Sequence, residues 1–309
     1  MPSKQNILPI VGVLSSALVW GLIWYPYRVL QDAGVSGGLA TLCTYSVAVL
    51  CGVFVLPRVW REWPTAGWWS ALLVLSAGWA NFGYVLAMLR GDVMRVLLLF
   101  YLAPVWTILF SRWLLGERPN RYGYLVIALS FCGAFIMLWE PNSGMPLPQN
   151  MSEWIGVSAG MGFALSNVVS RRASTLSVMT KSCSVLIGTA ALTAPLLWWQ
   201  GGVPQQFLAF DGQIVLLLVL MGGVLFATSM AVQYGVTHLP ANRAMLLFLF
   251  ELVVAAVAAY LLADEVMQWR DWLGAVLIVS ASLLSGKLHH VGDHDHDHDH
   301  DHGNGNAHA

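Results

Sequence analysis

One residue pattern occurs twice in this chain, at a fixed separation of 148 residues. At this offset Arg95, Leu98, Leu99, Phe100, Val105, Leu114, Glu117 and Leu125 align with Arg243, Leu246, Leu247, Phe248, Val253, Leu262, Glu265 and Leu273. Both copies lie in long apolar stretches. Two related, mainly apolar half-chains are typical of membrane carriers, in which two repeats surround a central site.

The composition indicates a membrane protein. Charged residues make up 10% of the 309 residues and hydrophobic residues 57%, so most of the chain is expected in lipid. The net charge of −1 gives no electrostatic reason to expect nucleic-acid binding. The four cysteines lie in apolar runs without metal-ligand spacing, and we interpret them as packing residues. The apolar run 7–27 lacks a small-residue cleavage site, which favours a retained first span.

Ten apolar segments have the length of a membrane-spanning helix. They cover residues 7–30, 37–57, 67–89, 93–115, 120–139, 153–172, 179–199, 213–236, 241–263 and 269–288. This pattern predicts an all-α integral membrane protein. Its ten transmembrane helices form a 5+5 inverted repeat, because two repeats with an odd number of spans enter the membrane in opposite orientations.

The basic residues predict the orientation. With the N-terminus in the cytoplasm, eleven of the 15 Lys and Arg residues fall on the cytoplasmic side and four outside, which places both termini in the cytoplasm. A bacterial inner membrane is the expected location. The predicted units are a first repeat (1–139), an external linker (140–152), a second repeat (153–288) and a disordered, Asp/His-rich cytoplasmic tail (289–309).

The tail has its own chemistry. Asp and His alternate from Asp293 to His302 without any apolar residue, and such a segment cannot build a core. Its imidazoles are candidate ligands for weak binding of divalent transition metals. They are His294, His296, His298, His300 and His302. The alternative interpretation is a solvated tail with incidental metal affinity, and no other cofactor is expected.

The ends of the fourth and ninth predicted spans carry a family resemblance. LLLFYLAPVWTILFSRWLLGERP occupies 97–119, and LLFLFELVVAAVAAYLLADEV occupies 246–266. Both resemble the fourth helix of an EamA-type repeat, an apolar span with a mid-helix Pro that ends in Gly-Glu. Residues 7–288 as a whole resemble the EamA family of the drug/metabolite transporter superfamily. The resemblance implies a 5+5 inverted repeat, alternating access, and export or exchange of small organic metabolites, often amino acids or related compounds.

The second copy departs from this motif. Leu252 stands where the motif commonly has Pro, and Ala263-Asp264-Glu265 replaces Gly-Glu. In this motif Glu117 and Glu265 close their helices at opposite faces of the membrane. Two roles stay open for them, namely an interfacial anchor that pairs with a loop arginine and a gating residue.

Four arginines lie at the ends of corresponding spans. Arg28 and Arg95 are expected at outer ends, and their counterparts Arg171 and Arg243 at inner ends. Each arginine is either a snorkelling anchor or part of an electropositive entrance that recruits carboxylate-bearing substrates.

Aromatic and polar residues within the spans are candidates for a central cavity. Trp20 and Trp24 form a helical stripe with Arg28, which indicates either cavity lining or helix packing. Buried polar groups in spans must contact protein or water. The candidate substrate-binding or cavity residues are Trp20, Trp24, Arg28, Asn81, Tyr84, Arg95, Trp106, Asn167, Gln233, Tyr234 and Arg243.

Glu251 is the one carboxylate predicted deep in the membrane. It follows Arg243 by eight residues, and a rise of about 1.5 Å per residue places it roughly 12 Å into a hydrocarbon core about 30 Å thick. An ionised carboxylate is costly there, so the group should find a partner or carry a proton. We hypothesise that Glu251 couples transport to proton movement, and the alternative is a structural hydrogen bond to a neighbouring helix.

The predicted function is secondary active transport of small organic metabolites. A Walker-type motif and the residue sets of common hydrolases are absent from the sequence, which argues against an ATP-driven pump and against an enzyme. Divalent transition-metal transport is the alternative, prompted by the tail and weakened by the lack of clustered His and Asp in the spans. The expected partners are the bilayer and a small molecule, without nucleic acid, and a homodimer is compatible with the sequence.

Overall fold

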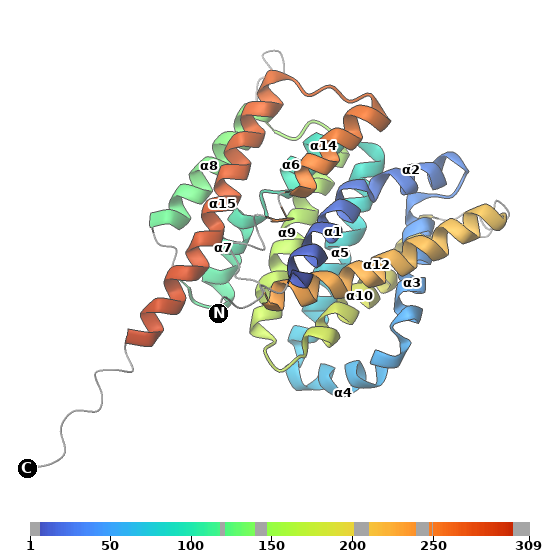
Figure 1. The fold of residues 1–309 in the computed structure, drawn as a ribbon, viewed down its shortest axis with the longest axis horizontal. Helices are drawn as coiled ribbons and strands as arrows, with labels where there is room; N and C mark the ends of the chain where they lie inside the picture. Colours follow the sequence, from blue (N-terminus) through green and yellow to red (C-terminus); the bar gives the residue numbers. More distant parts are fainter. Residues whose placement is uncertain are drawn as a thin grey trace, which may run out of the picture.

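A computed structural model describes residues 7–117, 121–139, 147–200, 210–238, 247–248 and 250–298. All regular elements in these ranges are helices (Figure 1). They are α1 (Leu8–Leu22), α2 (Trp24–Asp32), α3 (Gly37–Cys51), the short 3-10 helix η1 (Val53–Val55), α4 (Leu56–Ala66), α5 (Trp68–Arg90), α6 (Val93–Phe100), α7 (Ala103–Leu114), α8 (Arg121–Leu138), α9 (Met151–Arg172), α10 (Val178–Gln200), α12 (Gly212–His238), α14 (Phe250–Ala263) and α15 (Trp269–His298). The all-α prediction is confirmed for this part of the chain.

Among the described residues, six helical stretches are long and apolar enough to cross a membrane, or seven if α3 and the bent η1–α4 segment count as one span. The six are Leu8–Asp32, Trp68–Arg90, Val93–Leu114, Arg121–Leu138, Val178–Trp198 and Gly212–Val232. Helix α14 has only 14 described residues, and α9 carries Glu153, Arg171 and Arg172 near its ends. These stretches indicate a helical protein with several membrane spans. The count of ten spans and the inverted arrangement stay predictions.

Two of the predicted spans are broken in the middle. The first is divided into α1 and α2 at Ile23, and the fourth into α6 and α7 at Tyr101 and Leu102. Pro104 lies in the first turn of α7. Because proline has no backbone N–H and fixes its φ angle, it can start a helix but cannot continue one without disturbing the preceding turn. The break brings Tyr101 to the centre of the fourth span.

The closest helix packing joins the two halves of the chain. Helix α5 packs on α9 and α10, α1 packs on α12 and α14, and α8 packs on α15. Figure 1 shows α8 and α15 running antiparallel at one side of the bundle. Their backbones are close, because a Cβ atom at Gly133 would lie 2.8 Å from the carbonyl oxygen of Gly274, and one at Gly274 would lie 2.7 Å from that of Gly133. Small residues permit such approach in membranes.

The last helix extends further than the sequence predicts. Helix α15 continues to His298, so it enters the segment 289–309 that the composition assigns to a disordered tail. A helix that is already formed adds further residues at low cost, since nucleation is the costly step. His300 and His302 lie outside the described residues.

Candidate functional site

A carboxylate held by two tyrosines lies between the two halves. Glu251 is in the first turn of α14. Its Oε1 accepts a hydrogen bond of 3.2 Å from the Tyr84 hydroxyl, and its Oε2 accepts one of 3.1 Å from the Tyr101 hydroxyl. Tyr84 comes from α5 and Tyr101 follows α6. Each half therefore contributes to one half-buried polar cluster, and Glu251 has the contact with a neighbouring helix that its structural interpretation requires.

The same hydroxyls have a second acceptor within reach. The Tyr84 oxygen is 3.4 Å from the carbonyl oxygen of Trp20, and the Tyr101 oxygen is 3.3 Å from that of Phe248. A hydroxyl carries one proton and can donate one full hydrogen bond, although it can also accept. Either tyrosine can therefore turn from the carboxylate to a carbonyl if Glu251 itself donates.

Aromatic rings surround this cluster. Trp20 meets Tyr84 edge-on with ring centroids 5.9 Å apart, and Tyr84 meets Phe100 at 5.2 Å. Phe100 in turn packs on Phe163 of α9 at 5.4 Å. Trp20, which the sequence places on a stripe, thus contacts one of the two tyrosines that hold Glu251. The aromatic rings linked in this way come from α1, α5, α6 and α9.

Asn81 and Trp24 have structural partners. The Asn81 Oδ1 accepts a 3.0 Å hydrogen bond from the Tyr45 hydroxyl, and its Nδ2 donates to the carbonyl oxygen of Ala77 at 2.9 Å. Trp24 is 1% exposed and donates from Nε1 to the Gly21 carbonyl oxygen. These contacts favour the interpretation of Asn81 and Trp24 as packing residues.

Arg28 lies in a dense set of contacts in the middle of α2. Its guanidinium stacks on the Trp24 ring at 4.7 Å and donates to the carbonyl oxygens of Met88 and Gly91, both at 3.1 Å. Its Nη2 is also 3.6 Å from Oε1 of Glu265.

Glu265 is held at the start of α6. It accepts hydrogen bonds from the backbone N–H groups of Val93 (3.0 Å) and Met94 (3.3 Å), which lack partners within the helix. Burial raises the pKa of Glu265, and the Asp92 carboxylate raises this pKa further, whereas the two N–H groups act in the opposite direction. The net effect is a carboxyl group that takes up a proton more readily than usual.

Arg95 pairs with a second carboxylate. Its Nε lies 3.4 Å from Oε1 of Glu153, at the start of α9. The Nε and Nη2 atoms are buried and have no hydrogen-bond partner among the described residues. Arg28 and Arg95 therefore both have a carboxylate neighbour that offsets their positive charge. The electropositive entrance stays a prediction.

The counterpart of Arg28 in the repeat is also paired. Arg171, in the last turn of α9, makes a two-pronged contact with Glu117, with Nη2–Oε1 at 2.6 Å and Nη1–Oε2 at 3.3 Å. The two side chains are 45% and 47% exposed. Such fork-to-fork geometry is favoured by the planar guanidinium.

The other predicted residues are dispersed. Asn167 is exposed on α9, Tyr234 is half-buried on α12, and the buried Trp106 Nε1 has no hydrogen-bond partner among the described residues. The Gln233 side chain and Arg243 lie outside what the structure describes. Groups of metal-ligating side chains are not found in the described part of the chain.

Tyr101 was missed by the sequence interpretation. The signal for it exists, because it is a hydroxyl-bearing residue within an uncharged apolar run, like Tyr84. The reasoning that a polar group in lipid needs a partner applies to both.

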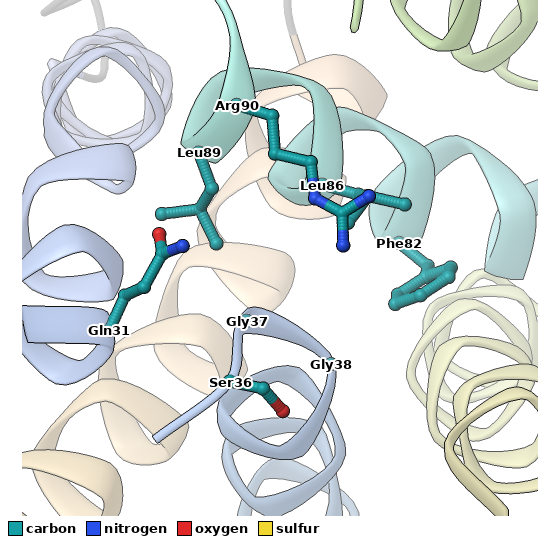
Figure 2. Close-up of a pocket in the computed structure, with 8 residues that line it drawn as sticks. All are labelled: Gln31, Ser36, Gly37, Gly38, Phe82, Leu86, Leu89 and Arg90. Atoms are coloured by element: carbon teal, nitrogen blue, oxygen red, sulfur yellow. The ribbon is translucent and has the colours of Figure 1, made fainter. Parts of the chain in front are cut away.

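A small cavity lies apart from the carboxylate, between α2, the start of α3 and the end of α5. Figure 2 shows Arg90 reaching over the first residues of α3 at this cavity. Its volume is about 70 Å³, about half that of an engineered apolar cavity of roughly 150 Å³ that binds benzene. The lining residues are Gln31, Ser36, Gly37, Gly38, Phe82, Leu86, Leu89 and Arg90. The cavity is too small for an organic metabolite.

Comparison with known proteins agrees with this architecture. The model of the EamA-like transporter family matches residues 7–139 and 150–286. An uncharacterized transporter of Archaeoglobus fulgidus is 26% identical over 202 residues, which cover 65% of this chain and 70% of that protein. An uncharacterized transporter of Pseudomonas aeruginosa is 20% identical over 241 residues, or 74% of this chain and 76% of that protein.

Two further comparisons are more limited. Protein RarD of Salmonella typhi is 22% identical over 149 residues, which cover 46% of this chain and 51% of RarD. A crystal structure of another protein superposes with a TM-score of 0.57 over 91% of this chain and 98% of that chain, at 19% sequence identity. The last comparison shows a shared fold.

Proposed function

Because the chain belongs to the EamA-like transporter family, we propose that it is a secondary active transporter that exports or exchanges small organic metabolites. Its substrates are amino-acid-like or other carboxylate-bearing compounds, and it works by alternating access between two five-span repeats of opposite orientation. The separate matches of the family model to 7–139 and 150–286 support the two repeats. The protein lies in a bacterial inner membrane with both termini in the cytoplasm.

Glu251 couples this transport to proton movement. The observation that carries this proposal is the position of its carboxylate between the hydroxyls of Tyr84 and Tyr101. An ionised carboxylate at membrane depth costs on the order of 2.5–3.5 kcal/mol by insertion scales. The two hydroxyl donors compensate part of that cost, so both charged and neutral states of the group are accessible.

The tyrosines accommodate either state of Glu251. When the carboxylate is ionised, both hydroxyls donate to it. When it is protonated, it donates to one tyrosine oxygen, and that tyrosine donates to the nearby carbonyl oxygen of Trp20 or Phe248. Every polar group then keeps a partner, which is the condition for a buried group to titrate without disrupting its surroundings.

Substitution of Glu251 tests the coupling. The substrate is first identified by comparing metabolites in medium and cytosol when the protein is overproduced. In proteoliposomes, Glu251→Gln should abolish accumulation driven by a pH gradient and retain substrate exchange, because the amide keeps the hydrogen bonds but cannot release a proton. Asp211→Asn is the matched control, since this carboxylate caps α12 away from the cluster. Unchanged pH-driven transport in Glu251→Gln would leave only a structural role.

A further inference from the structure

The two glutamates that follow α7 and α14 have the same backbone setting. Gly116 and Asp264 both have positive φ, +73° and +53°, and each directly precedes its glutamate. The N–H of Glu117 donates to the Ser111 carbonyl oxygen at 3.3 Å, and that of Glu265 donates to the Ala259 carbonyl oxygen at 3.2 Å. In both copies this N–H reaches the carbonyl oxygen six residues earlier, across a helix end that is followed by a residue with positive φ.

Asp264 therefore adopts the positive φ that Gly116 has at the corresponding position of the first copy. Aspartate tolerates the left-handed conformation better than most residues, because its short side chain can bond locally. The departure from Gly-Glu in the second copy leaves the helix end intact. The corresponding atoms in the two copies are 148 residues apart, so the sequence repeat is reproduced in the backbone geometry.

Each of these glutamates reaches an arginine of the other half. Glu117, in the first half, pairs with Arg171 at the end of α9. Glu265, in the second half, pairs with Arg28 near the end of the helical stretch Leu8–Asp32. Arg28 and Arg171 are themselves counterparts in the repeat. The molecule thus makes one inter-half contact twice, each time between the end of a fourth span and the end of the other half's first span.

The two pairs lie at opposite ends of the molecule. Glu265 contacts the first residues of the helical stretch Val93–Leu114, at Val93 and Met94, and Glu117 follows its last residue. At about 1.5 Å per residue, 22 residues span roughly 33 Å. This is close to the thickness of the hydrocarbon core, about 30 Å.

We propose that the two inter-half contacts are alternating latches: the contacts of Glu265 with Arg28 and with the start of α6 close the outer end, and the Arg171–Glu117 ion pair closes the inner end. The proposal rests on the alternating access of the proposed function. Rocking one half against the other separates the halves at one end and keeps them together at the opposite end. Because each pair joins the halves at one end only, opening that end breaks its own pair and leaves the other formed.

The contacts also show which partner leaves at the outer end. Arg28 is bonded to Met88 and Gly91 of its own half, so it stays with α2 and α5. Glu265 is the group that moves, and its departure exposes the N–H groups of Val93 and Met94 to water. At the inner end the pair has no such additional bonds among the described contacts of Arg171.

Thiol labelling from either side of the membrane tests the latches without a known substrate. The reporter is Trp20→Cys, at the central cluster, in a chain whose Cys43, Cys51, Cys132 and Cys183 are replaced. A membrane-impermeant maleimide is added to right-side-out or inside-out vesicles. Glu265→Ala should raise labelling from outside about tenfold, since it removes the two hydrogen bonds from Val93 and Met94 and the contact with Arg28. Glu117→Ala should raise labelling from inside about two- to fivefold, as expected for an exposed ion pair.

Three comparisons complete the experiment. Arg58→Ala breaks an ion pair within α4 and should change neither rate. Exchanging the inner charges, with Glu117→Arg and Arg171→Glu together, should restore the low inner rate. If Glu265→Ala does not insert, Arg28→Ala removes the ion pair alone and should raise labelling from outside by a smaller factor, because the hydrogen bonds from Val93 and Met94 to Glu265 remain. Equal effects on both sides, or no effect in variants that insert normally, would overturn the latches. The role of Glu251 in coupling is measured separately, by the transport assay with Glu251→Gln.

Discussion

The two ends of the molecule make the same inter-half contact by different physical means. At the inner end, Arg171 and Glu117 form a two-pronged pair of 2.6 and 3.3 Å between side chains that are 45% and 47% exposed. At the outer end, Arg28 and Glu265 are 3.6 Å apart and only 27% and 13% exposed. The inner contact depends mainly on charge, and the outer one mainly on hydrogen bonds to the start of α6.

This difference predicts unequal behaviour of the two ends. An exposed ion pair contributes about 0–1 kcal/mol, because water and salt screen it. Hydrogen bonds to unpaired N–H groups at a helix start are retained by an uncharged acceptor as well as by a charged one. The inner end is therefore expected to open more readily, and the outer end to respond to the protonation of a single group.

Amide substitution at both glutamates should separate charge from hydrogen bonding. Glu265→Gln keeps an oxygen that accepts from Val93 and Met94, so outside labelling should stay within about twofold of the parent, against about tenfold for Glu265→Ala. At the inner end Glu117→Gln should behave like Glu117→Ala, because the charge that attracts Arg171 is lost in both. Maleimide labelling of the Trp20→Cys reporter measures all four variants. If the ratio of the labelling rate of the Gln variant to that of the Ala variant were the same at both ends, the two ends would not differ in their dependence on charge and hydrogen bonding.

The outer end should close further as the external pH falls. The closed conformation raises the pKa of Glu265 above its ordinary value of 4.5, and a solvent-exposed, open conformation leaves it near that value. Protons therefore bind the closed form more tightly, and closure is favoured as pH falls from the raised pKa towards 4.5, with no further gain below it. Outside labelling measured between pH 4 and 8 checks this window, where each pKa unit of difference between the two forms is worth about tenfold.

Burial is the main cause of the raised pKa of Glu265, and two charged neighbours modify the size of the pH effect. Asp92 repels the ionised form of Glu265, and Arg28 attracts it. Asp92→Asn should reduce the pH dependence of labelling, and Glu265→Ala should abolish it. A pH profile that survives Glu265→Ala would assign the sensitivity to another group.

Salt should affect the inner end alone. The screening length falls from about 10 Å at 0.1 M to about 3 Å at 1 M ionic strength, and exposed pairs are screened most. Raising the salt concentration should increase inside labelling up to about twofold, approaching the rate of Glu117→Ala, and should leave outside labelling unchanged. Glu117→Ala itself should show no salt response. An equal response at both ends would contradict the assignment of charge to one of them.

The sequence predicted the elements better than their contacts. The apolar runs located the helices, and the argument that a polar group in lipid needs a partner singled out both Glu251 and Tyr84, which do meet. Tyr101 followed from the same argument and was overlooked. The partner of Arg28 could not be predicted, because Glu265 lies in the opposite half and its distance depends on how α2, α6 and α14 pack. The positive φ of Asp264 was hidden because the motif has glycine at that position.

The packing between halves has a consequence for how the protein is made. Helices α1, α5 and α8 find their main neighbours in α12, α14, α9, α10 and α15, all of which are synthesised later. While the ribosome is translating the first half, the face of α8 that contains Gly133 has only lipid against it, until α15 emerges at the end of the chain. A nascent chain released after the first half would therefore insert its helices without their packing partners, and it would present them to the proteases that survey the membrane.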